Sequence, residues 1–241
     1  MRLDVYLVET GRVESRTRAS HLIKMGGVCV DGRPITKPSY EVGEGATVEV
    51  TDLIGYASLG GLKLKQAIDK FSLSVSGRCV DIGASNGGFT HCLLSYGANE
   101  VYAVDVGECA LPDYLRQDER VRVLDRTNAR DLTPDMVGGL ANIVVADVSF
   151  ISITYLLPTI ASILSPDGYA VVLVKPQFEV GPKALGKSGV VRDPKLRSAA
   201  VDKVISCAAA CGLVRRGLCE VPLIFEDKNV EYLLLLRPKK V

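Results

Sequence analysis

The chain has 241 residues, of which 47% are hydrophobic and 24% charged, and its 29 basic residues nearly balance 28 acidic ones. These values exclude a disordered chain and a uniformly basic nucleic-acid-binding protein, but they allow a basic face on one side. The length suits one large domain, or a medium domain with a small appendage.

The seven cysteines and the apolar segments indicate the compartment. The cysteines show no framework spacing, which favours a reducing cytosol over a disulfide scaffold. Cys207 and Cys211 lie one turn apart on an expected helix, so burial against the core explains them better than zinc does. The N-terminus lacks the apolar core of a signal peptide, and no apolar run is long enough to span a membrane. We expect a soluble, cytoplasmic protein without a metal site or a membrane partner.

Residues 1–52 predict a small α+β unit. Ser15 is placed to cap a helix whose apolar positions Ala19, Leu22 and Ile23 share one face, and Gly26 follows its end. Two short strands, VCV and TVEV, come next. Residues 53–61 read as a linker, and residues 62–241 as a second domain.

Basic residues in this first unit are candidates for contact with RNA. Seven basic side chains stand against eight acidic ones, so the unit is not basic overall. On charge alone a solvated face is the simpler interpretation. The candidate RNA contacts are Arg2, Arg12, Arg16, Arg18, Lys24 and Lys37.

The second domain alternates apolar strands with helices, which predicts a Rossmann-like, doubly wound, mostly parallel seven-stranded sheet. Strands are expected at CVDIG, VYAVDV, VRVLD, NIVVADVS, YAVVLVK and EYLLLLR. Helices are expected near residues 87–97, 133–140, 152–164 and 194–212, with a short one before VRVLD.

The loop after the first strand of this domain, DIGASNGGFT, favours a cofactor other than a dinucleotide. Ser85 stands where the dinucleotide pattern needs a glycine, but a small residue there still admits the amino-acid part of S-adenosylmethionine. Asp105 ends the second strand, where a carboxylate can accept both ribose hydroxyls, and Asn128 could recognise an adenine edge. The alternative is a tight turn with two capping side chains. The candidate cofactor residues are Gly83, Ser85, Asn86, Gly87, Gly88, Asp105 and Asn128.

Four charged residues are expected to point into the same crevice. Asp147 and Lys175 end apolar strands, Glu231 opens the last strand, and Lys63 begins the helix after the linker. Each alone is more often structural, but two lysines and two carboxylates can neutralise each other on burial. A lysine becomes a base where burial or a second ammonium favours its neutral form. The set therefore predicts removal of a hydroxyl proton during methyl transfer.

These motifs carry a family resemblance. The run SRTRASHLIKMGGVCVDGRPITKPSYEVGEGATVEV resembles the S4 RNA-binding domain, which docks a helix face onto structured RNA. From residue 56 the chain resembles the FtsJ-like ribose 2′-O-methyltransferases, in DIGASNGGFT, RTNAR, VADVSFIS, VKPQFEVG, GVVRDP and NVEY. Together the two parts resemble the TlyA-type family of rRNA methyltransferases, also known as hemolysin A.

The resemblance implies a class I methyltransferase domain that uses S-adenosylmethionine. It assigns the family's catalytic Lys-Asp-Lys-Glu set to Lys63, Asp147, Lys175 and Glu231. It also implies that the substrate is a ribose 2′-hydroxyl, usually of cytidine, in 16S or 23S rRNA within 30S or 50S ribosomal subunits. We expect a monomer.

The segment after Lys175, EVGPKALGKSGVVRDPKLR, has a basic excess. It is either a solvated loop or a mobile lid that binds phosphates, and its candidate RNA contacts are Lys183, Lys187 and Arg192.

Three other functions remain to be weighed. Leu59, Asn86 and the turn residues Phe225 and Lys228 depart from the family pattern, which keeps a catalytically silent RNA-binding protein under consideration. The S4-like unit and the basic segment argue against a small-molecule methyltransferase. A pore-forming toxin would need a signal peptide, a spanning segment or a cationic amphipathic helix.

Overall fold

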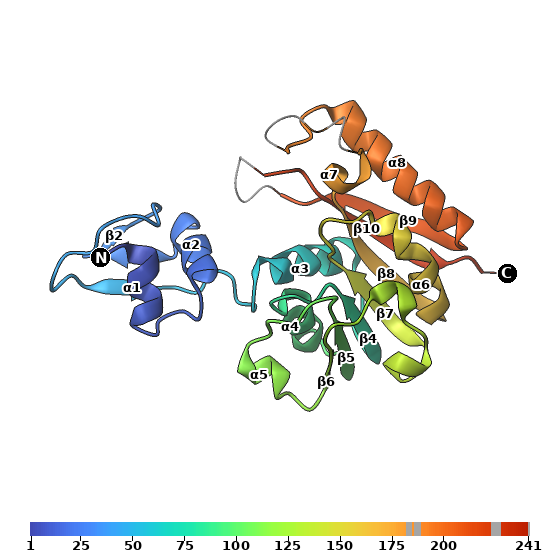
Figure 1. Cartoon of the computed structure of the whole chain (residues 1–241), viewed down its shortest axis with the longest axis horizontal. Helices are drawn as coiled ribbons and strands as arrows, with labels where there is room; N and C mark the ends of the chain where they lie inside the picture. The colour runs from blue at the N-terminus through green and yellow to red at the C-terminus, as the bar shows by residue number, and fades with distance from the viewer. Residues whose placement is uncertain (182–184, 186–188, 223–227, 241) are drawn as a thin grey trace. The chain divides into compact units, whose positions relative to one another are not determined.

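The computed structural model describes residues 1–181, 185, 189–222 and 228–240, and the chain divides into two compact units, Met1–Ser58 and Leu59–Val241. Contacts within each unit define the division, which falls inside the segment expected to be a linker. Figure 1 shows the elements of both units.

The N-terminal unit has two helices that pack against each other and a small antiparallel sheet of order β2-β1-β3. As predicted, Ser15 caps the second helix, because its Oγ accepts the backbone N–H of Arg18 at 3.2 Å. Gly26, at φ 79°, follows the helix end. The first helix was not predicted. The bounds are α1 Leu3–Glu9, α2 Arg16–Lys24, β1 Val28–Val30, β2 Arg33–Pro34 and β3 Val48–Val50.

The second unit is built on a seven-stranded sheet of order β6-β5-β4-β7-β8-β10-β9. The neighbours from β6 to β8 run parallel, and β10 is antiparallel to both β8 and β9. The predicted Rossmann-like, mostly parallel sheet is therefore confirmed. The strands are β4 Arg78–Ile82, β5 Glu100–Val104, β6 Val121–Leu124, β7 Ala141–Ala146, β8 Leu164–Val174, β9 Leu213–Glu220 and β10 Tyr232–Pro238.

Helices cover both faces of this sheet. The helices α3 and α4 pack together on one face, and α6 and α8 lie on the other (Figure 1). The α-helices are α3 Leu59–Phe71, α4 Gly88–Ser95, α5 Asp113–Arg116, α6 Leu157–Ile163, α7 Pro176–Glu179 and α8 Pro194–Ala210. Three short 3-10 helices are η1 Ala129–Asp131, η2 Asp135–Val137 and η3 Ile153–Tyr155.

The central strands are buried on both faces, which explains their continuous apolar runs. The run AVVLV of β8 is fully covered, from Ala170 at 0% exposure to Val174 at 0%. Each such valine or leucine contributes about 1.5–3 kcal/mol of transfer free energy. That burial holds the strand ends, and the polar residues that follow them, in fixed positions.

Two expectations about elements were wrong, and one strand was not predicted. The helix expected near 133–140 is only the short η2, because Gly138 and Gly139 take positive φ angles and end it. The helix α3 begins at Leu59, so Lys63 lies in its second turn rather than at its start. The edge strand β9 was not predicted, because arginines and a glycine interrupt its apolar pattern.

The structure also bears on the expectations of free, core-packed cysteines and of no membrane-spanning segment. All seven cysteines are free thiols, and Cys207 and Cys211 are partly buried against the core, as expected. Within the described ranges, none of the helices is both long enough and apolar enough to cross a membrane.

Candidate active site at the carboxyl end of the sheet

Strand register brings the predicted polar residues to one edge of the sheet. Gly83, Asp105 and Asp147 directly follow the parallel neighbours β4, β5 and β7. Tyr232 of β10 pairs with Val174 of β8, so the next residues outward along these two strands are Glu231 and Lys175. All of these residues therefore meet at the carboxyl end of the parallel strands, where ligands of such sheets bind.

The four predicted charges form two ion pairs. Nζ of Lys63 lies 2.6 Å from Oε2 of Glu231, and Nζ of Lys175 lies 2.6 Å from Oδ1 of Asp147. Lys175 also donates a hydrogen bond of 2.8 Å to Oγ of Ser149. The Lys175 side chain is only 10% exposed. Because a buried ammonium without partners would be costly, the carboxylate and the hydroxyl keep it in place.

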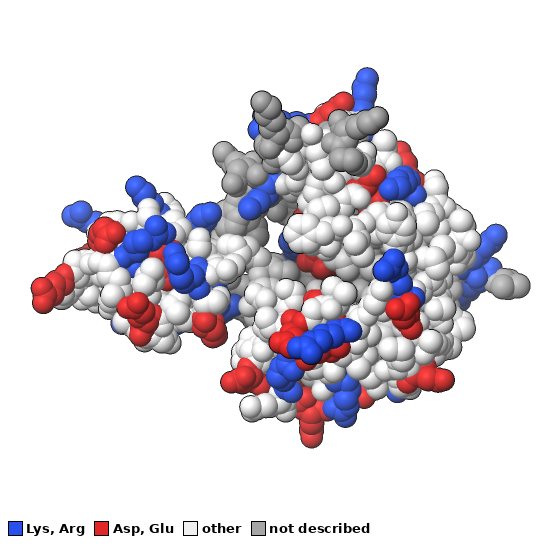
Figure 2. All heavy atoms as spheres, in the orientation of Figure 1, with Lys and Arg blue, Asp and Glu red and all other residues white. Residues whose placement is uncertain are grey.

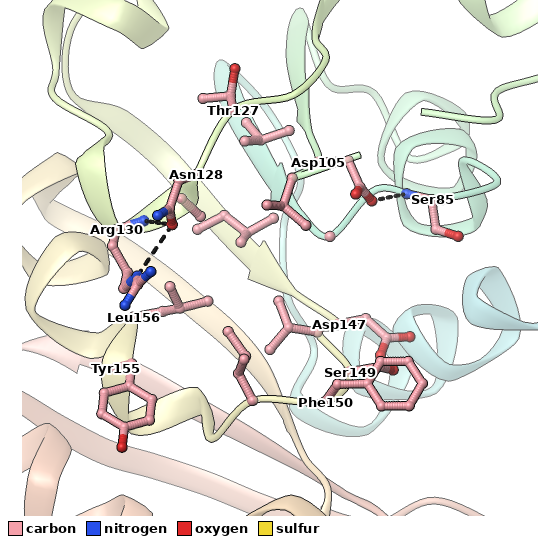
Figure 3. A pocket seen from close by; sticks show the side chains of 17 residues that line it. Ser85, Asp105, Thr127, Asn128, Arg130, Asp147, Ser149, Phe150, Tyr155 and Leu156 are labelled. Atoms are coloured by element: carbon pink, nitrogen blue, oxygen red, sulfur yellow. Dashed lines mark hydrogen bonds between the residues drawn. The ribbon is translucent and has the colours of Figure 1, made fainter. Parts of the chain in front are cut away.

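A pocket of about 540 Å³ opens beside Asp147 (Figure 3). It lies against the ends of β4, β5, β6 and β7, and this volume is typical of small-molecule sites. The lining residues are Ile82, Gly83, Ser85, Val104, Asp105, Val106, Thr127, Asn128, Ala129, Arg130, Asp147, Val148, Ser149, Phe150, Ile151, Tyr155 and Leu156.

The glycine-rich loop forms one wall of the pocket. Gly83 has φ 81°, and a Cβ there would lie 2.6 Å from the backbone oxygen of Asp147, so only glycine fits. Ser85 also has a positive φ of 46°. Gly83 and Ser85 line the pocket, whereas Asn86, Gly87 and Gly88 are not among its lining residues. Gly87 instead caps α4, in the left-handed conformation.

Asp105 and Asn128 stand at separate points of the pocket wall (Figure 3). The Asp105 carboxylate accepts the backbone N–H groups of Ser85 at 3.0 Å and Gly107 at 2.9 Å. A carboxylate has about four lone-pair sites, so two backbone bonds leave it able to accept two hydroxyl groups. Oδ1 of Asn128 accepts the Arg130 backbone N–H at 3.1 Å and thereby caps η1. Asn128 therefore acts as a capping residue, which was the alternative to adenine recognition considered from the sequence.

Two side chains beside Asp147 were not among the predicted site residues. Ser149 bonds to Lys175, and Phe150 lines the pocket with an exposure of 89% and a φ of 68°. An exposed aromatic residue in a left-handed conformation is unusual and marks a position fixed by its surroundings. The available signal was their place directly after Asp147 in VADVSFIS.

A buried acid lies beneath the loop. Asp81 on β4 is 0% exposed and accepts a hydrogen bond of 2.7 Å from Oγ1 of Thr90 on α4. Burial is the main reason that its pKa is raised to about 7, and the charges of Asp147 and Asp105 add to the effect. The carboxyl group thus couples the floor of the site to α4. Sequence reasoning missed it, since Asp81 reads as one polar residue within a strand.

In the N-terminal unit, internal contacts occupy several of the predicted RNA-binding arginines. Arg2 and Arg16 both bond to the buried Asp4, at 2.9 Å and 3.0 Å, and hydrogen bonding to Arg2 is the main reason that the pKa of Asp4 is lowered to about 2. Arg12 donates to the backbone oxygen of Val48 at 2.6 Å. Figure 2 shows basic side chains gathered over the middle of this unit, with acidic ones around them. Lys24 is exposed at the end of α2, and Lys37 is exposed in a loop.

Arg18 differs from the expectation of an exposed position, because its side chain is only 14% exposed. Nη1 donates to the backbone oxygen of Tyr56 at 2.6 Å, and Nη2 pairs with Asp52 at 2.6 Å. The guanidinium therefore fastens the segment that follows β3 to α2.

The basic segment after α7 is only partly described. Lys183 and Lys187 lie outside the described residues, and Arg192 is exposed. Asn229, two residues before Glu231, accepts the Val191 backbone N–H at 2.8 Å and donates to the Gly189 backbone oxygen at 3.0 Å. This contact ties residues 189–191 to the chain that leads into β10.

Both units of the chain match known protein families. The model of the FtsJ-like methyltransferases matches residues 56–238, which is most of the chain. This protein belongs to the FtsJ-like methyltransferase family. The S4 domain model matches residues 1–48, in the N-terminal unit.

Full-length relatives agree with this family. The 16S/23S rRNA (cytidine-2′-O)-methyltransferase TlyA of Mycobacterium tuberculosis is 46% identical, and the match covers 98% of this chain and 89% of that protein. Hemolysin A of Brachyspira hyodysenteriae is 40% identical over 97% of this chain and 98% of that protein. A solved structure from Streptococcus thermophilus is 38% identical to this chain in sequence and superposes on it with a TM-score of 0.78. The match covers 99% of this chain and 88% of the chain in that structure.

Membership in the FtsJ-like family makes the pocket and the two ion pairs the candidate active site of a methyltransferase. The two ion pairs use all four residues that the family resemblance singled out.

Proposed function

We propose that this FtsJ-like methyltransferase transfers a methyl group from S-adenosylmethionine to a ribose 2′-hydroxyl of cytidine in 16S or 23S rRNA. The observation that carries the proposal is the buried Lys175–Asp147 ion pair, at 2.6 Å, on the rim of a pocket of about 540 Å³. A lysine bonded to two residues that line a cofactor-sized pocket, Asp147 and Ser149, suits proton removal next to a bound methyl donor.

The residues of the pocket fit S-adenosylmethionine. Asp105 has capacity for the two ribose hydroxyls beyond its bonds to Ser85 and Gly107. Val106, Ile151 and Leu156 offer apolar wall beside Asn128, which suits a purine ring. When bound, S-adenosylmethionine supplies a methyl group on a sulfonium, which is an electrophile.

Proton removal is the step that this chain's residues contribute. Lys175 would first release its ammonium proton to solvent, and its Nζ would then take the proton of the 2′-hydroxyl as the ribose oxygen bonds to the methyl carbon and the carbon–sulfur bond breaks. The products are a methyl ether, a neutral thioether and a lysine ammonium. Asp147 and Ser149 stabilise that ammonium, since both already contact Nζ. Lys63 and Glu231 form a second ion pair, with no net charge, at the same end of the sheet.

Phe150 and the basic side chains support an RNA substrate. The ring of Phe150 is 89% exposed at the pocket, which suits stacking on an unpaired base. Exposed Lys24, Lys37 and Arg192 suit contacts with phosphates, and the S4 match favours structured RNA. The M. tuberculosis relative is named for cytidine 2′-O-methylation of 16S and 23S rRNA.

The proposed partners are 30S and 50S ribosomal subunits, which the protein would meet in the cytoplasm, acting as a monomer. Structured rRNA is the substrate that an S4 unit and a ribose-directed site would jointly select.

The test incubates the protein and methyl-labelled S-adenosylmethionine with 30S and 50S subunits from a strain that lacks the enzyme. Label should appear at a ribose 2′-oxygen, located by resistance of that position to alkaline cleavage. Lys175→Ala should abolish the label while it still binds S-adenosylmethionine in titration calorimetry. Absence of label from both subunits, together with label on tRNA, would reject the rRNA assignment. Failure of the wild type to bind S-adenosylmethionine in the presence of RNA would favour a silent RNA-binding protein.

A further inference from the structure

Three successive contacts join the loop after β7 to the loop after β8. The first is the pair of Lys175 with Asp147 and Ser149. In the second, the rings of Phe150 and Phe178 lie with their centroids 5.6 Å apart. The third is a hydrogen-bonded cluster around Glu179, the last residue of α7.

Glu179 is the buried member of this series, with a side chain that is 1% exposed. Oε2 accepts the hydroxyl of Ser152 at 2.5 Å, and Oε1 accepts the backbone N–H of Ile153 at 2.9 Å. From α8, Nζ of Lys203 donates to Oε2 at 3.1 Å and to the backbone oxygen of Glu179 at 3.0 Å. Both carboxylate oxygens are thus bonded, which makes the buried charge tolerable.

Along the chain, these contacts lie on the far side of Asp147, Phe150 and Lys175 from the strands β7 and β8. Asp147 and Phe150 lie between the end of β7 and the Ser152–Ile153 anchor, while only three residues separate Lys175 from Glu179. Each proposed reactive group is therefore bounded by a buried strand on one side and by the Glu179 cluster on the other. Without the anchor, the loop would be free to relax the left-handed backbone of Phe150, at φ 68°.

We infer that Glu179 is a positioning residue for methyl transfer. Its carboxylate, held by Lys203, fixes the β7 loop to the β8 loop, so that Lys175 and Phe150 keep the geometry the reaction needs. This inference rests on the proposed function, but it assigns a role to a residue that does not line the pocket and is not one of the four paired charges. A misplacement of reacting groups by about 1 Å can cost about a hundredfold in rate.

The decisive experiment measures single-turnover methylation and S-adenosylmethionine affinity for Glu179→Gln. The amide oxygen can still accept the Ile153 N–H, but the amide nitrogen that replaces Oε2 cannot accept from Ser152 or from the Lys203 ammonium. The methylation rate should fall by about tenfold to a hundredfold, with the dissociation constant for S-adenosylmethionine within about twofold of wild type. Glu100→Gln is the matched control, because Glu100 also accepts from a cation, Arg78, but at the opposite end of the sheet.

Two further variants keep the inference testable if Glu179→Gln does not fold. Lys203→Met removes the cation from a side chain that is 49% exposed, and Ser152→Ala removes one bond to the carboxylate. Each should lower the methylation rate in the same direction, with cofactor affinity retained.

Three other outcomes of these measurements would overturn the inference. A folded Glu179→Gln protein with the wild-type rate would show that the cluster does not position the site. A rate loss matched by lost cofactor affinity and a lower unfolding temperature would show a merely structural role. An inactive wild type would reject the proposed function, and this inference with it, whereas an active wild type with an unaffected variant rejects only the inference.

Discussion

The two ends of the seven-stranded sheet carry similar residues in different arrangements. At the amino end, Arg78 pairs with Glu100 at 3.2 Å, and the Asn99 and Asn142 side chains accept backbone N–H groups of Gly77 and Arg78. At the carboxyl end, the charged pairs border a pocket of about 540 Å³.

Left-handed backbone is also found at the carboxyl end. Ser85, Arg126 and Phe150, which follow β4, β6 and β7, all have positive φ angles. Non-glycine residues adopt this conformation at a cost, which the surrounding structure must offset. Similar polar groups thus close turns at one end and surround a ligand-sized space at the other, so location in the sheet, rather than residue type, distinguishes the site.

The largest expected difference between the two ends comes from Lys175→Met. Loss of the proposed base should lower the methylation rate by about a hundredfold to ten-thousandfold, which is the usual contribution of a general base. The label transferred to ribosomal subunits measures it. Calorimetric binding of S-adenosylmethionine should persist, and a rate within threefold or so of wild type would contradict the assignment of Lys175 as the base.

Asp105→Ala should weaken binding of S-adenosylmethionine by about tenfold to a hundredfold, since a hydrogen bond to a charged group contributes about 1.5–3 kcal/mol. Asp125→Ala is the control, because Asp125 also follows a strand but accepts the Cys109 backbone N–H, at 2.6 Å, outside the pocket lining. Calorimetry compares the two variants. Equal weakening in both would mean that loop structure, not ribose binding, is being measured.

Asp81→Asn should change how stability depends on pH. The pKa of Asp81 is raised from 3.8 to about 7, so in this range the folded state holds a proton that the unfolded state has released. Wild-type stability should therefore fall, relative to the variant, as the pH rises from about 4 to about 7, by up to about 1.4 kcal/mol per pH unit. Urea unfolding across this range measures the difference, and parallel curves for the two proteins would disprove it.

The smallest effect is expected at the amino end. Glu100→Gln should change the free energy of unfolding by less than about 1 kcal/mol, because its pair with Arg78 is partly solvated. Methylation should stay at the wild-type level. A large loss of activity from this variant would contradict the view that only the carboxyl end acts in the reaction.

Most strands of the second unit were predicted correctly from their continuous apolar runs. The strands around Val80, Val144 and Val172 are buried on both faces, and a doubly buried strand must be apolar throughout. The edge strand β9 was missed because its sequence is not continuously apolar. Within β9, Arg215, Arg216 and Gly217 break the apolar run, and only hydrogen bonding to β10 makes it a strand.

The sequence by itself determined the mostly parallel, doubly wound sheet and the strand-end positions of Asp147, Lys175 and Glu231, because apolar periodicity and strand-end position are local properties of the chain. Only the tertiary structure decided how those residues pair, Lys63 with Glu231 and Lys175 with Asp147. It also decided that Arg18 is committed to internal contacts and that Glu179 is buried among Ser152, Ile153 and Lys203. Partners such as Lys63 and Glu231, 168 positions apart, are set by strand order and register, which no local pattern encodes.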